Sequence, residues 1–204
     1  MGSRRALASA LSRLDAFAEP RLELEQYVTP AEIAASLVHE ADLRGDLDRL
    51  VCDLGTGTGM LAIAAAIRGA DSVGLEIDPD AIATATANAV DAGVAVEFVL
   101  GDVTRHPLCV DRDVTVVMNP PFGAQRGRRG ADRPFLLAAA ELATVSYSVH
   151  NAESRAFVEA FAEDHGGHLT HAFGLELDLP AQFDFHEEAV AAIEAEAYRI
   201  EWAD

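Results

Sequence analysis

Short apolar runs and longer amphipathic stretches alternate along most of this chain. Runs rich in valine and leucine and bounded by glycine, proline or charged residues are typical of buried strands. Such runs cover residues 50–54, 72–76, 94–100, 113–118, 145–150 and 168–179. The other stretches repeat their apolar residues at helical spacing, which predicts helices. The predicted helices cover residues 3–18, 30–43, 60–68, 79–92, 135–142 and 154–164.

The tail, residues 187–202, carries two conflicting signals. Alanine and glutamate favour a helix, whereas Tyr198, Ile200 and Trp202 alternate as in a strand. We assign the tail to a strand that pairs antiparallel with residues 168–179. The alternation of strands and helices along the chain then predicts an α/β fold. We expect a mostly parallel, right-handed sheet of seven strands that ends in an antiparallel hairpin.

The length of 204 residues, half of them apolar, fits a single domain with helices on both faces of its sheet. Residues 1–45 would supply N-terminal helices and a ligand-contacting segment, and residues 46–204 the sheet core. No apolar run reaches the roughly eighteen residues of a membrane-spanning helix. Two cysteines, Cys52 and Cys109, indicate reduced thiols and a cytoplasmic location, and no Cys/His spacing suggests a metal site.

The charge of the chain is strongly acidic. It holds 34 acidic residues against 15 basic ones, all of them arginine, for a net charge of -19. Such a charge ordinarily argues against nucleic acid as a partner. It also fits a halophilic protein, because molar salt screens charges within about 3 Å. We favour this second interpretation, under which net charge says little about partners.

The strand at residues 113–118 runs into Asn119-Pro120-Pro121-Phe122. Prolines cannot donate to a sheet ladder, so Asn119 lies at the carboxyl end of the strand, where open α/β sheets bind ligands. The side-chain carbonyl of Asn119 and the backbone carbonyl of Pro120 can accept both hydrogens of a planar amine. Phe122 can stack on the ring that carries the amine. For this motif alone, an ordinary loop is the alternative.

Three further features follow strand ends. A turn with glycines at positions 55, 57 and 59 follows Asp53 and lets the backbone approach a ligand closely. Met60 breaks the dinucleotide-binding glycine fingerprint, and Asp53 suits a cationic ligand better than a pyrophosphate. Glu76 can accept the hydroxyls of a ribose, and Asp102 an adenine amino group. For Glu76 alone, a solvated acid is the alternative.

A basic cluster directly follows the Asn-Pro-Pro-Phe turn. It consists of Arg126, Arg128, Arg129 and Arg133 among glycines. Because no other basic cluster occurs in this acidic chain, we expect it to contact phosphate, with a solvated face as the alternative.

The segment of residues 24–30, Leu-Glu-Gln-Tyr-Val-Thr-Pro, precedes the second predicted helix. Thr29 is expected to cap that helix, with Pro30 at its first position. By themselves, Gln26 and Tyr27 read as a solvated loop.

Together these motifs resemble the class I methyltransferases that use S-adenosylmethionine. The Asn-Pro-Pro-Phe turn is similar to those of enzymes that methylate planar amines, and residues 24–30 resemble the adenine-N6 branch. The match is closer to the ribosomal RNA adenine-N6 methyltransferases called methyltransferase-like protein five and their archaeal relatives. Other shared features are Gly130-Ala131-Asp132 with Phe135-Leu136, and residues 145–150. The resemblance extends from the first helix to around residue 186.

The resemblance implies a Rossmann-like fold and S-adenosylmethionine as the cofactor. The residues expected at the cofactor are Gln26, Tyr27, Thr29, Asp53, Gly55, Gly57, Thr58, Met60, Glu76, Asp102 and Val103. Those expected at the target adenine are Asn119, Pro120, Pro121 and Phe122. A small zinc-binding activator protein is the implied partner. The family's sheet order leaves residues 94–100 at an edge, so we expect the activator to pair there unless the chain's own loops cover it.

The expected function is methylation of adenine N6 in RNA, with small-subunit ribosomal RNA as the substrate. One alternative is another amino methyltransferase, acting on guanine N2 or on a protein glutamine. The other is a non-catalytic module that only binds RNA or a partner, against which the intact turn argues. The chain differs from the family at Glu76, usually an aspartate, and at Glu187-Glu188, where relatives are lysine-rich.

Overall fold

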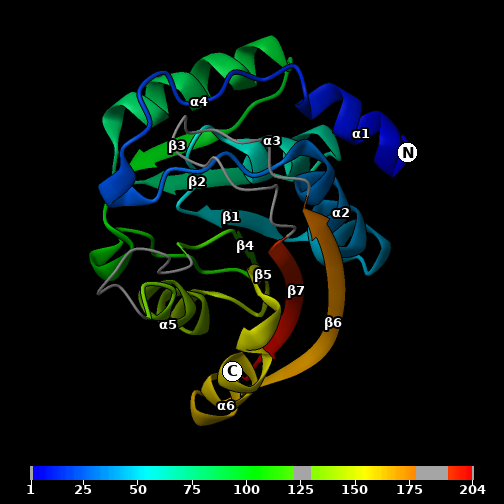
Figure 1. Cartoon of the computed structure of the whole chain (residues 1–204), viewed down its shortest axis with the longest axis vertical. Coiled ribbons are helices and arrows are strands. Elements are labelled where there is room, and N and C mark those ends of the chain that lie inside the picture. The colour runs from blue at the N-terminus through cyan, green and yellow to red at the C-terminus, as the bar shows by residue number, and fades with distance from the viewer. Residues whose placement is uncertain (1, 122–129, 178–192, 204) are drawn as a thin grey trace.

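The computed structural model describes residues 2–121, 130–177 and 193–203. In this part of the chain, seven strands form one sheet in the order β3-β2-β1-β4-β5-β7-β6 (Figure 1). The parallel strands are β1 (Leu50–Leu54), β2 (Ser72–Glu76), β3 (Glu97–Leu100), β4 (Val114–Met118) and β5 (Val145–Asn151). The antiparallel hairpin consists of β6 (Gly167–Leu177) and β7 (Ile193–Trp202), and β7 pairs with β5. The predicted fold is confirmed, and the tail forms the predicted strand over residues 193–202. Residues 178–179 and 187–192 of the two predicted hairpin strands lie outside the described residues.

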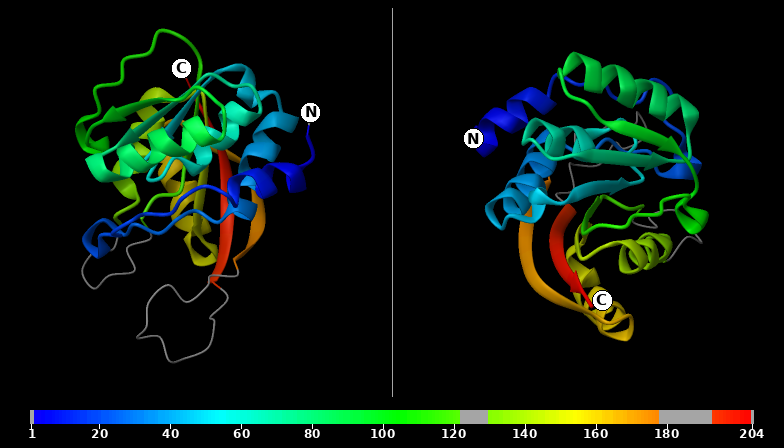
Figure 2. Two further views of the ribbon diagram at one scale, coloured as in Figure 1. Left: turned by 90° about the horizontal axis from the view of Figure 1, so that it is seen from above. Right: turned by 180° about the vertical axis from the view of Figure 1, so that it is seen from behind.

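Helices cover both faces of the sheet (Figures 1 and 2). One face packs against α1 (Arg4–Leu11), α2 (Ala31–Leu43), α3 (Met60–Ile67) and α4 (Pro79–Asp91). The other packs against α5 (Arg133–Leu142) and α6 (Arg155–Asp164). Alternate strand residues feed the two cores: Val51 and Val117 face the first, Cys52 and Val116 the second. The described residues include no helix long and apolar enough to cross a membrane.

The first helix is shorter than predicted, because it ends at Leu11 rather than at residue 18. The cause lies in α4, where the Asn88 amide pairs with the backbone of Asp15. Its Oδ1 accepts from the Asp15 N–H at 2.8 Å, and its Nδ2 donates to the Asp15 carbonyl at 3.0 Å. This pairing takes the Asp15 backbone out of any helical ladder. The chain then runs on without helix, and Phe17 reaches the glycine-rich turn.

Two other boundaries differ from expectation. The edge strand β3 begins at Glu97 rather than at residue 94, because its first partner on β2 is Val73, near the start of that strand. Helix α2 begins at Ala31 with Pro30 at its N-cap, and no side chain caps it. The prediction that Thr29 caps this helix is therefore wrong, since its hydroxyl is used elsewhere, as described below.

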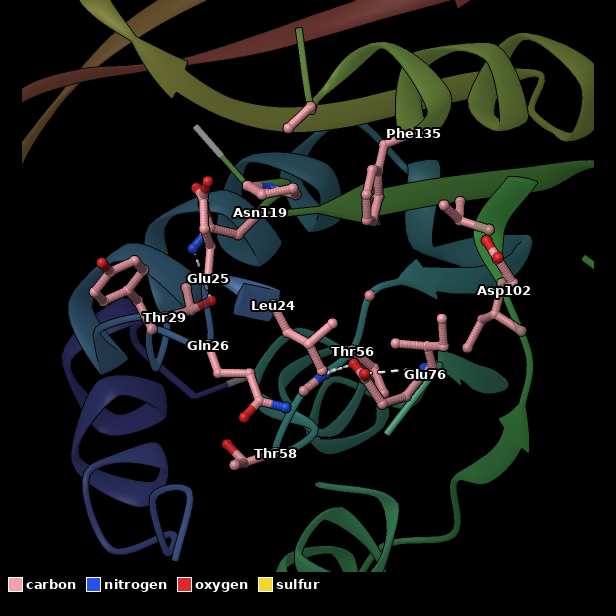
Figure 3. Close-up of a pocket in the computed structure, with 18 of the residues that line it drawn as sticks. Leu24, Glu25, Gln26, Thr29, Thr56, Thr58, Glu76, Asp102, Asn119 and Phe135 are labelled. Carbon is pink, nitrogen blue, oxygen red and sulfur yellow. Dashed lines mark hydrogen bonds between the residues drawn. The ribbon is translucent and has the colours of Figure 1, made fainter. Parts of the chain in front are cut away.

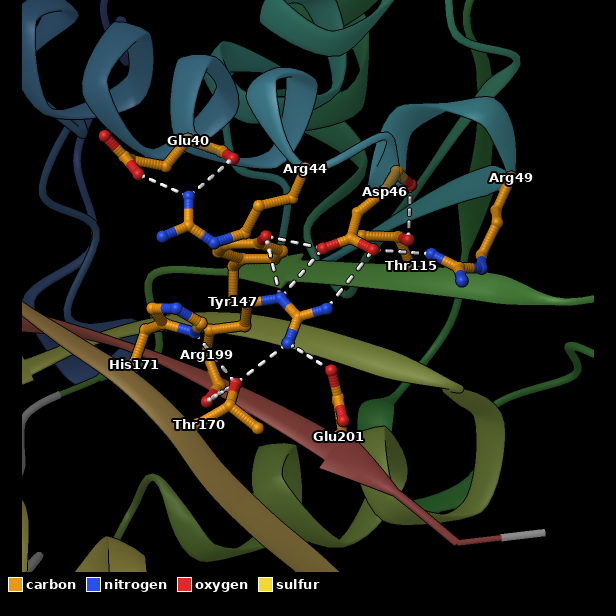
Figure 4. Close-up of polar contacts among 10 residues, drawn as sticks. All are labelled: Glu40, Arg44, Asp46, Arg49, Thr115, Tyr147, Thr170, His171, Arg199 and Glu201. Atoms are coloured by element: carbon orange, nitrogen blue, oxygen red, sulfur yellow. Dashed lines mark hydrogen bonds and ion pairs between the residues drawn. The ribbon is translucent and has the colours of Figure 1, made fainter.

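A buried ionic network joins the C-terminal hairpin to the short helix η2 (Asp46–Asp48) before β1 (Figure 4). Asp46 Oδ2 accepts hydrogen bonds from Tyr147 Oη at 2.6 Å and from Arg199 Nε at 2.8 Å. Burial opposes the ionised form of Asp46, but these bonds and one from Arg49 lower its pKa below the ordinary value. A buried charge of this kind needs its partners in place. The network therefore fixes β5 and β7 against the start of β1.

Candidate functional site

A cavity of about 260 Å³ lies at the carboxyl ends of the parallel strands (Figure 3). Most of the residues that the sequence singled out line it. These are Gln26, Tyr27, Thr29, Gly55, Gly57, Thr58, Met60, Glu76, Asp102, Val103, Asn119 and Pro121. They come from the N-terminal segment and from the ends of four strands, so the fold brings together what the sequence scatters over about 95 positions.

Seven predicted site residues do not line the cavity or lie outside the described residues. Asp53 and Pro120 are buried and do not line the cavity. Arg133 is exposed, and its guanidinium lies 5.1 Å from the ring centroid of Phe157 on α6. Phe122, Arg126, Arg128 and Arg129 lie outside the described residues.

The glycine-rich turn presents bare backbone to the cavity. Gly55 and Gly57 adopt φ angles of 70° and 55°, which favour glycine. A Cβ on Gly55 would come within 2.8 Å of the Phe135 ring, and one on Gly57 within 2.9 Å of the Phe17 ring. Side chains at either position would therefore collide with an aromatic wall of the cavity. Neither residue was predicted to line the cavity, because Phe17 reads as part of the first predicted helix and Phe135 stands only in a motif shared with the family.

Asp53 stabilises the glycine-rich turn through hydrogen bonds. Its Oδ2 accepts hydrogen bonds from Thr56 Oγ1 at 2.6 Å and from the Ala62 N–H at 3.0 Å. Complete burial raises the pKa of Asp53 to about 7, although both hydrogen bonds act in the opposite direction. This geometry therefore argues against a direct contact between the Asp53 carboxylate and a cationic ligand. Asp53 instead fixes the turn against the first turn of α3.

Glu76 lies at the end of β2 and is 8% exposed. Its Oε2 accepts from the Gly57 N–H at 2.9 Å, and its Oε1 accepts from the N–H groups of Ile77 at 2.9 Å and Asp78 at 3.0 Å. Each carboxylate oxygen can accept more than one hydrogen bond. The protein thus holds this carboxylate in one orientation and leaves it capacity to accept from a ligand.

Asp102 follows β3 on the neighbouring side of the cavity. The backbone N–H and the hydroxyl of Thr104 both donate to its Oδ1, each at 2.8 Å. The backbone bond first, and then the hydroxyl bond, lower the pKa of Asp102 below its ordinary value. The carboxylate is therefore an ionised acceptor at neutral pH. Its Oδ2 makes no hydrogen bond in the described part of the chain, so it can accept from a ligand.

The N-terminal segment closes the other side of the cavity. The Gln26 amide is held at both ends, since Oε1 accepts from the Arg21 N–H at 2.7 Å and Nε2 donates to Asp78 Oδ2 at 2.7 Å. Gln26 therefore fastens the segment to the end of β2 while its side chain lines the cavity. Glu25, which sequence reasoning passed over, also lines the cavity, is 7% exposed and has a positive φ of 49°. The N-terminal segment thus has a fixed, locally strained course beside the cavity.

Asn119 lies at the end of β4 with its side chain directed into the cavity (Figure 3). Its Nδ2 donates to Thr29 Oγ1 at 3.1 Å. Its Oδ1 is buried and accepts no hydrogen bond from the described residues. A buried acceptor without a partner is costly, so proteins rarely keep one without a use. The arrangement presents an oriented carbonyl oxygen to any donor that enters the cavity.

Comparison with known proteins gives consistent results. The model of the methyltransferase small domain matches residues 33–145. The chain is 36% identical to an uncharacterised protein of Methanocaldococcus jannaschii over 96% of this chain and 92% of that one. It is 35% identical to the rRNA N(6)-adenosine-methyltransferase Mettl5 of Drosophila melanogaster, over 97% and 95% of the two chains.

Solved structures agree with the sequence relatives. A crystal structure of an RNA methyltransferase candidate from Pyrococcus horikoshii superposes with a TM-score of 0.88. It is 38% identical in sequence, and the superposition covers 100% of both chains. The similarity therefore includes the N-terminal segment and the C-terminal hairpin as well as the central sheet.

Proposed function

This chain belongs to the methyltransferase family that includes the rRNA N(6)-adenosine-methyltransferase Mettl5, and from that premise we propose that it methylates N6 of an adenosine in small-subunit ribosomal RNA. S-adenosylmethionine is the cofactor of this methyltransferase family. The observation that carries the proposal is the Asn119 side chain, whose buried Oδ1 faces a cavity with two carboxylates at neighbouring strand ends. An acceptor of this kind suits the amino group of adenine.

The cavity fits S-adenosylmethionine by the chemistry of its donors and acceptors. Glu76 retains capacity for the ribose hydroxyls and Asp102 for the adenine amino group. The bare backbone at Gly55 and Gly57 allows the remaining part of S-adenosylmethionine to approach the glycine-rich turn closely. The hydroxyl of Thr58 is buried, lines the cavity and has no hydrogen-bond partner among the described residues. A bound ligand would give this hydroxyl a hydrogen-bond partner.

In the proposed reaction the protein supplies alignment. S-adenosylmethionine would supply an electrophilic methyl group and leave as S-adenosylhomocysteine when its methyl–sulfur bond breaks, so the chain needs no nucleophile of its own. The methylated nitrogen would lose one proton to solvent. Asn119 Oδ1, together with the proposed Pro120 carbonyl, accepts the hydrogens of the target amine and directs its nitrogen toward the methyl group. Alignment of this kind can lower a barrier by about 7–11 kcal/mol. The target adenine must be unpaired or flipped out to enter, and Phe122 is the proposed stacking partner.

The experiment that tests this proposal identifies the methylated product. The purified protein is incubated with methyl-labelled S-adenosylmethionine and with ribosomes whose RNA lacks the modification. After digestion to nucleosides, the label should elute as N6-methyladenosine. Label in N2-methylguanosine or in a protein glutamine would instead support the alternative amino methyltransferases. No transfer to any component, with cofactor bound, would support the non-catalytic binding module.

A second proposal concerns the basic cluster, of which Arg126, Arg128 and Arg129 would contact RNA phosphate. Replacing all three with glutamine should weaken RNA binding and reduce the slope of its salt dependence by about 2, because each phosphate that an arginine neutralises adds about 0.7 to that slope. Binding measured over a range of salt concentrations checks this. The control replaces three exposed arginines elsewhere, Arg5, Arg13 and Arg112. Equal slopes for the two triple variants would contradict phosphate binding by the cluster.

The third proposal places the zinc-binding activator protein on the edge strand β3. The structure confirms that this strand lies at an edge, but Phe98 packs inward beside Gly74. Leu100 is 58% exposed there, so Leu100→Asp should weaken capture of the activator about tenfold or more without disturbing the core. Val90→Asp on α4, where Val90 is 73% exposed, is the matched control. Full capture by Leu100→Asp would exclude this edge.

A further inference from the structure

Helix α5 begins at an aspartate that does not cap it. Asp132 occupies the N-cap position with φ -75° and ψ -21°, a helical conformation, and its side chain makes no capping hydrogen bond. An aspartate at this position ordinarily accepts from a backbone N–H of the first turn. Here its carboxylate points to the sheet instead, with Oδ2 3.4 Å from Nδ1 of His150. The Asp132 carboxylate therefore contacts His150 of β5 instead of capping the helix.

His150 is a buried histidine near the end of β5, 1% exposed. Its Nε2 lies 2.9 Å from Ser148 Oγ, and its ring packs beside Tyr198 with the centroids 5.6 Å apart. Nδ1 faces the Asp132 carboxylate, and Nε2 faces the Ser148 hydroxyl. Both ring nitrogens are thus held by neighbours, which fixes the orientation of the imidazole.

The pair joins two walls of the methyl-transfer site. The register of β4 and β5 pairs Met118 with Ser148, so the turn after Asn119 leaves the sheet alongside His150. On the other side of the contact, Ala131, Pro134 and Phe135 line the cavity. Asp132 lies within this lining segment but turns its carboxylate away from the cavity. The pair therefore ties residues 131–135 to the strand next to Asn119.

We propose that Asp132 and His150 are positioning residues for methyl transfer. They hold the start of α5 at a fixed place relative to Asn119. The inference rests on the proposed RNA methylation, because the aligned group is the target base rather than the cofactor. A displaced wall lowers the rate of transfer, since small misplacements of reacting groups are costly. Neither residue touches the reacting atoms.

The experiment measures the single-turnover rate of methyl transfer to ribosomal RNA at saturating S-adenosylmethionine, together with cofactor affinity by calorimetry. Asp132→Ala and His150→Ala should each lower the rate about tenfold or more. The double variant should be no slower than the slower single variant, because the two side chains act as one unit. Asp132→Asn keeps a hydrogen-bonding partner for Nδ1 and should retain most of the rate. Cofactor affinity should stay that of wild type in all four.

The chain provides a matched control on the same helix. At the other end of α5, Glu141 Oε2 lies 3.5 Å from Nε2 of His106, away from the cavity. Glu141→Ala should leave the rate unchanged. A wild-type rate in Asp132→Ala, which changes a side chain near the surface, would overturn the inference. A fall in cofactor affinity that matches the fall in rate would overturn it too. Absence of transfer to RNA by the wild-type protein would contradict the proposed function itself, and the inference with it.

Discussion

Replacing Asn119 with alanine should lower the rate of methyl transfer on the order of a hundredfold or more, as losses of one preorganised hydrogen-bonding group in an active site do. The reason is the buried Oδ1, which the Thr29 hydroxyl orients through Nδ2 and which would accept from the target amine. Affinity for S-adenosylmethionine should not change, because this oxygen is assigned to the base. Single-turnover rates and calorimetry measure the two quantities separately.

Two variants sharpen this test. Asn119→Asp keeps an acceptor oxygen, and the Thr29 hydroxyl can rotate to donate to it, so this variant should retain far more activity than Asn119→Ala. Asn151→Ala, at the end of the neighbouring strand β5 and away from the cavity lining, is the control and should act as wild type. Near-normal transfer by Asn119→Ala would remove Asn119 from the mechanism.

Replacing Glu76 with alanine should weaken S-adenosylmethionine binding about ten- to hundredfold, since hydrogen bonds to a charged group are worth about 1.5–3 kcal/mol. The loss has two sources. The ribose hydroxyls would lose their acceptor, and the N–H groups of Gly57, Ile77 and Asp78 would lose the carboxylate that orders the turn. Calorimetry with the cofactor measures the effect directly.

The control for Glu76 is Glu97→Ala, which removes an exposed carboxylate from the adjacent strand β3 and should bind the cofactor as wild type does. Glu76→Gln should fall between wild type and Glu76→Ala, because an amide oxygen can still accept but carries no charge. Wild-type affinity in Glu76→Ala would refute the ribose assignment and the place of the cofactor in this cavity.

Positions at strand ends could be predicted from the sequence for a physical reason. Buried parallel strands read as apolar runs, and their carboxyl ends meet at one edge of the sheet. Glu76, Asp102 and Asn119 each follow such a run, so their common cavity follows from the topology. The tail assignment succeeded because alternate residues of a strand face opposite sides of the sheet. Tyr198 and Ile200 are buried on one face, while the intervening Arg199 joins the polar network on the other.

Side-chain partners from distant parts of the chain could not be predicted in this way. Thr29 looked like a helix cap, but its hydroxyl is bound by Asn119, 90 positions away. The first helix looked long, but Asn88, 73 positions from Asp15, takes the backbone of that residue. Asp53 looked like a ligand-binding acid because the sequence does not show that the fold directs its carboxylate to Thr56 and to the Ala62 N–H. Each error comes from a tertiary contact that overrides a local preference.

The most direct test of the account is the content of N6-methyladenosine in small-subunit ribosomal RNA, measured by mass spectrometry of its nucleosides. The comparison is between a strain that lacks this gene and the same strain carrying the wild-type or the Asn119→Ala gene. We expect one site to lose its methyl group in the deletion strain, to regain it with the wild-type gene and to stay unmethylated with Asn119→Ala. Full N6-methyladenosine in the deletion strain would contradict the proposed function.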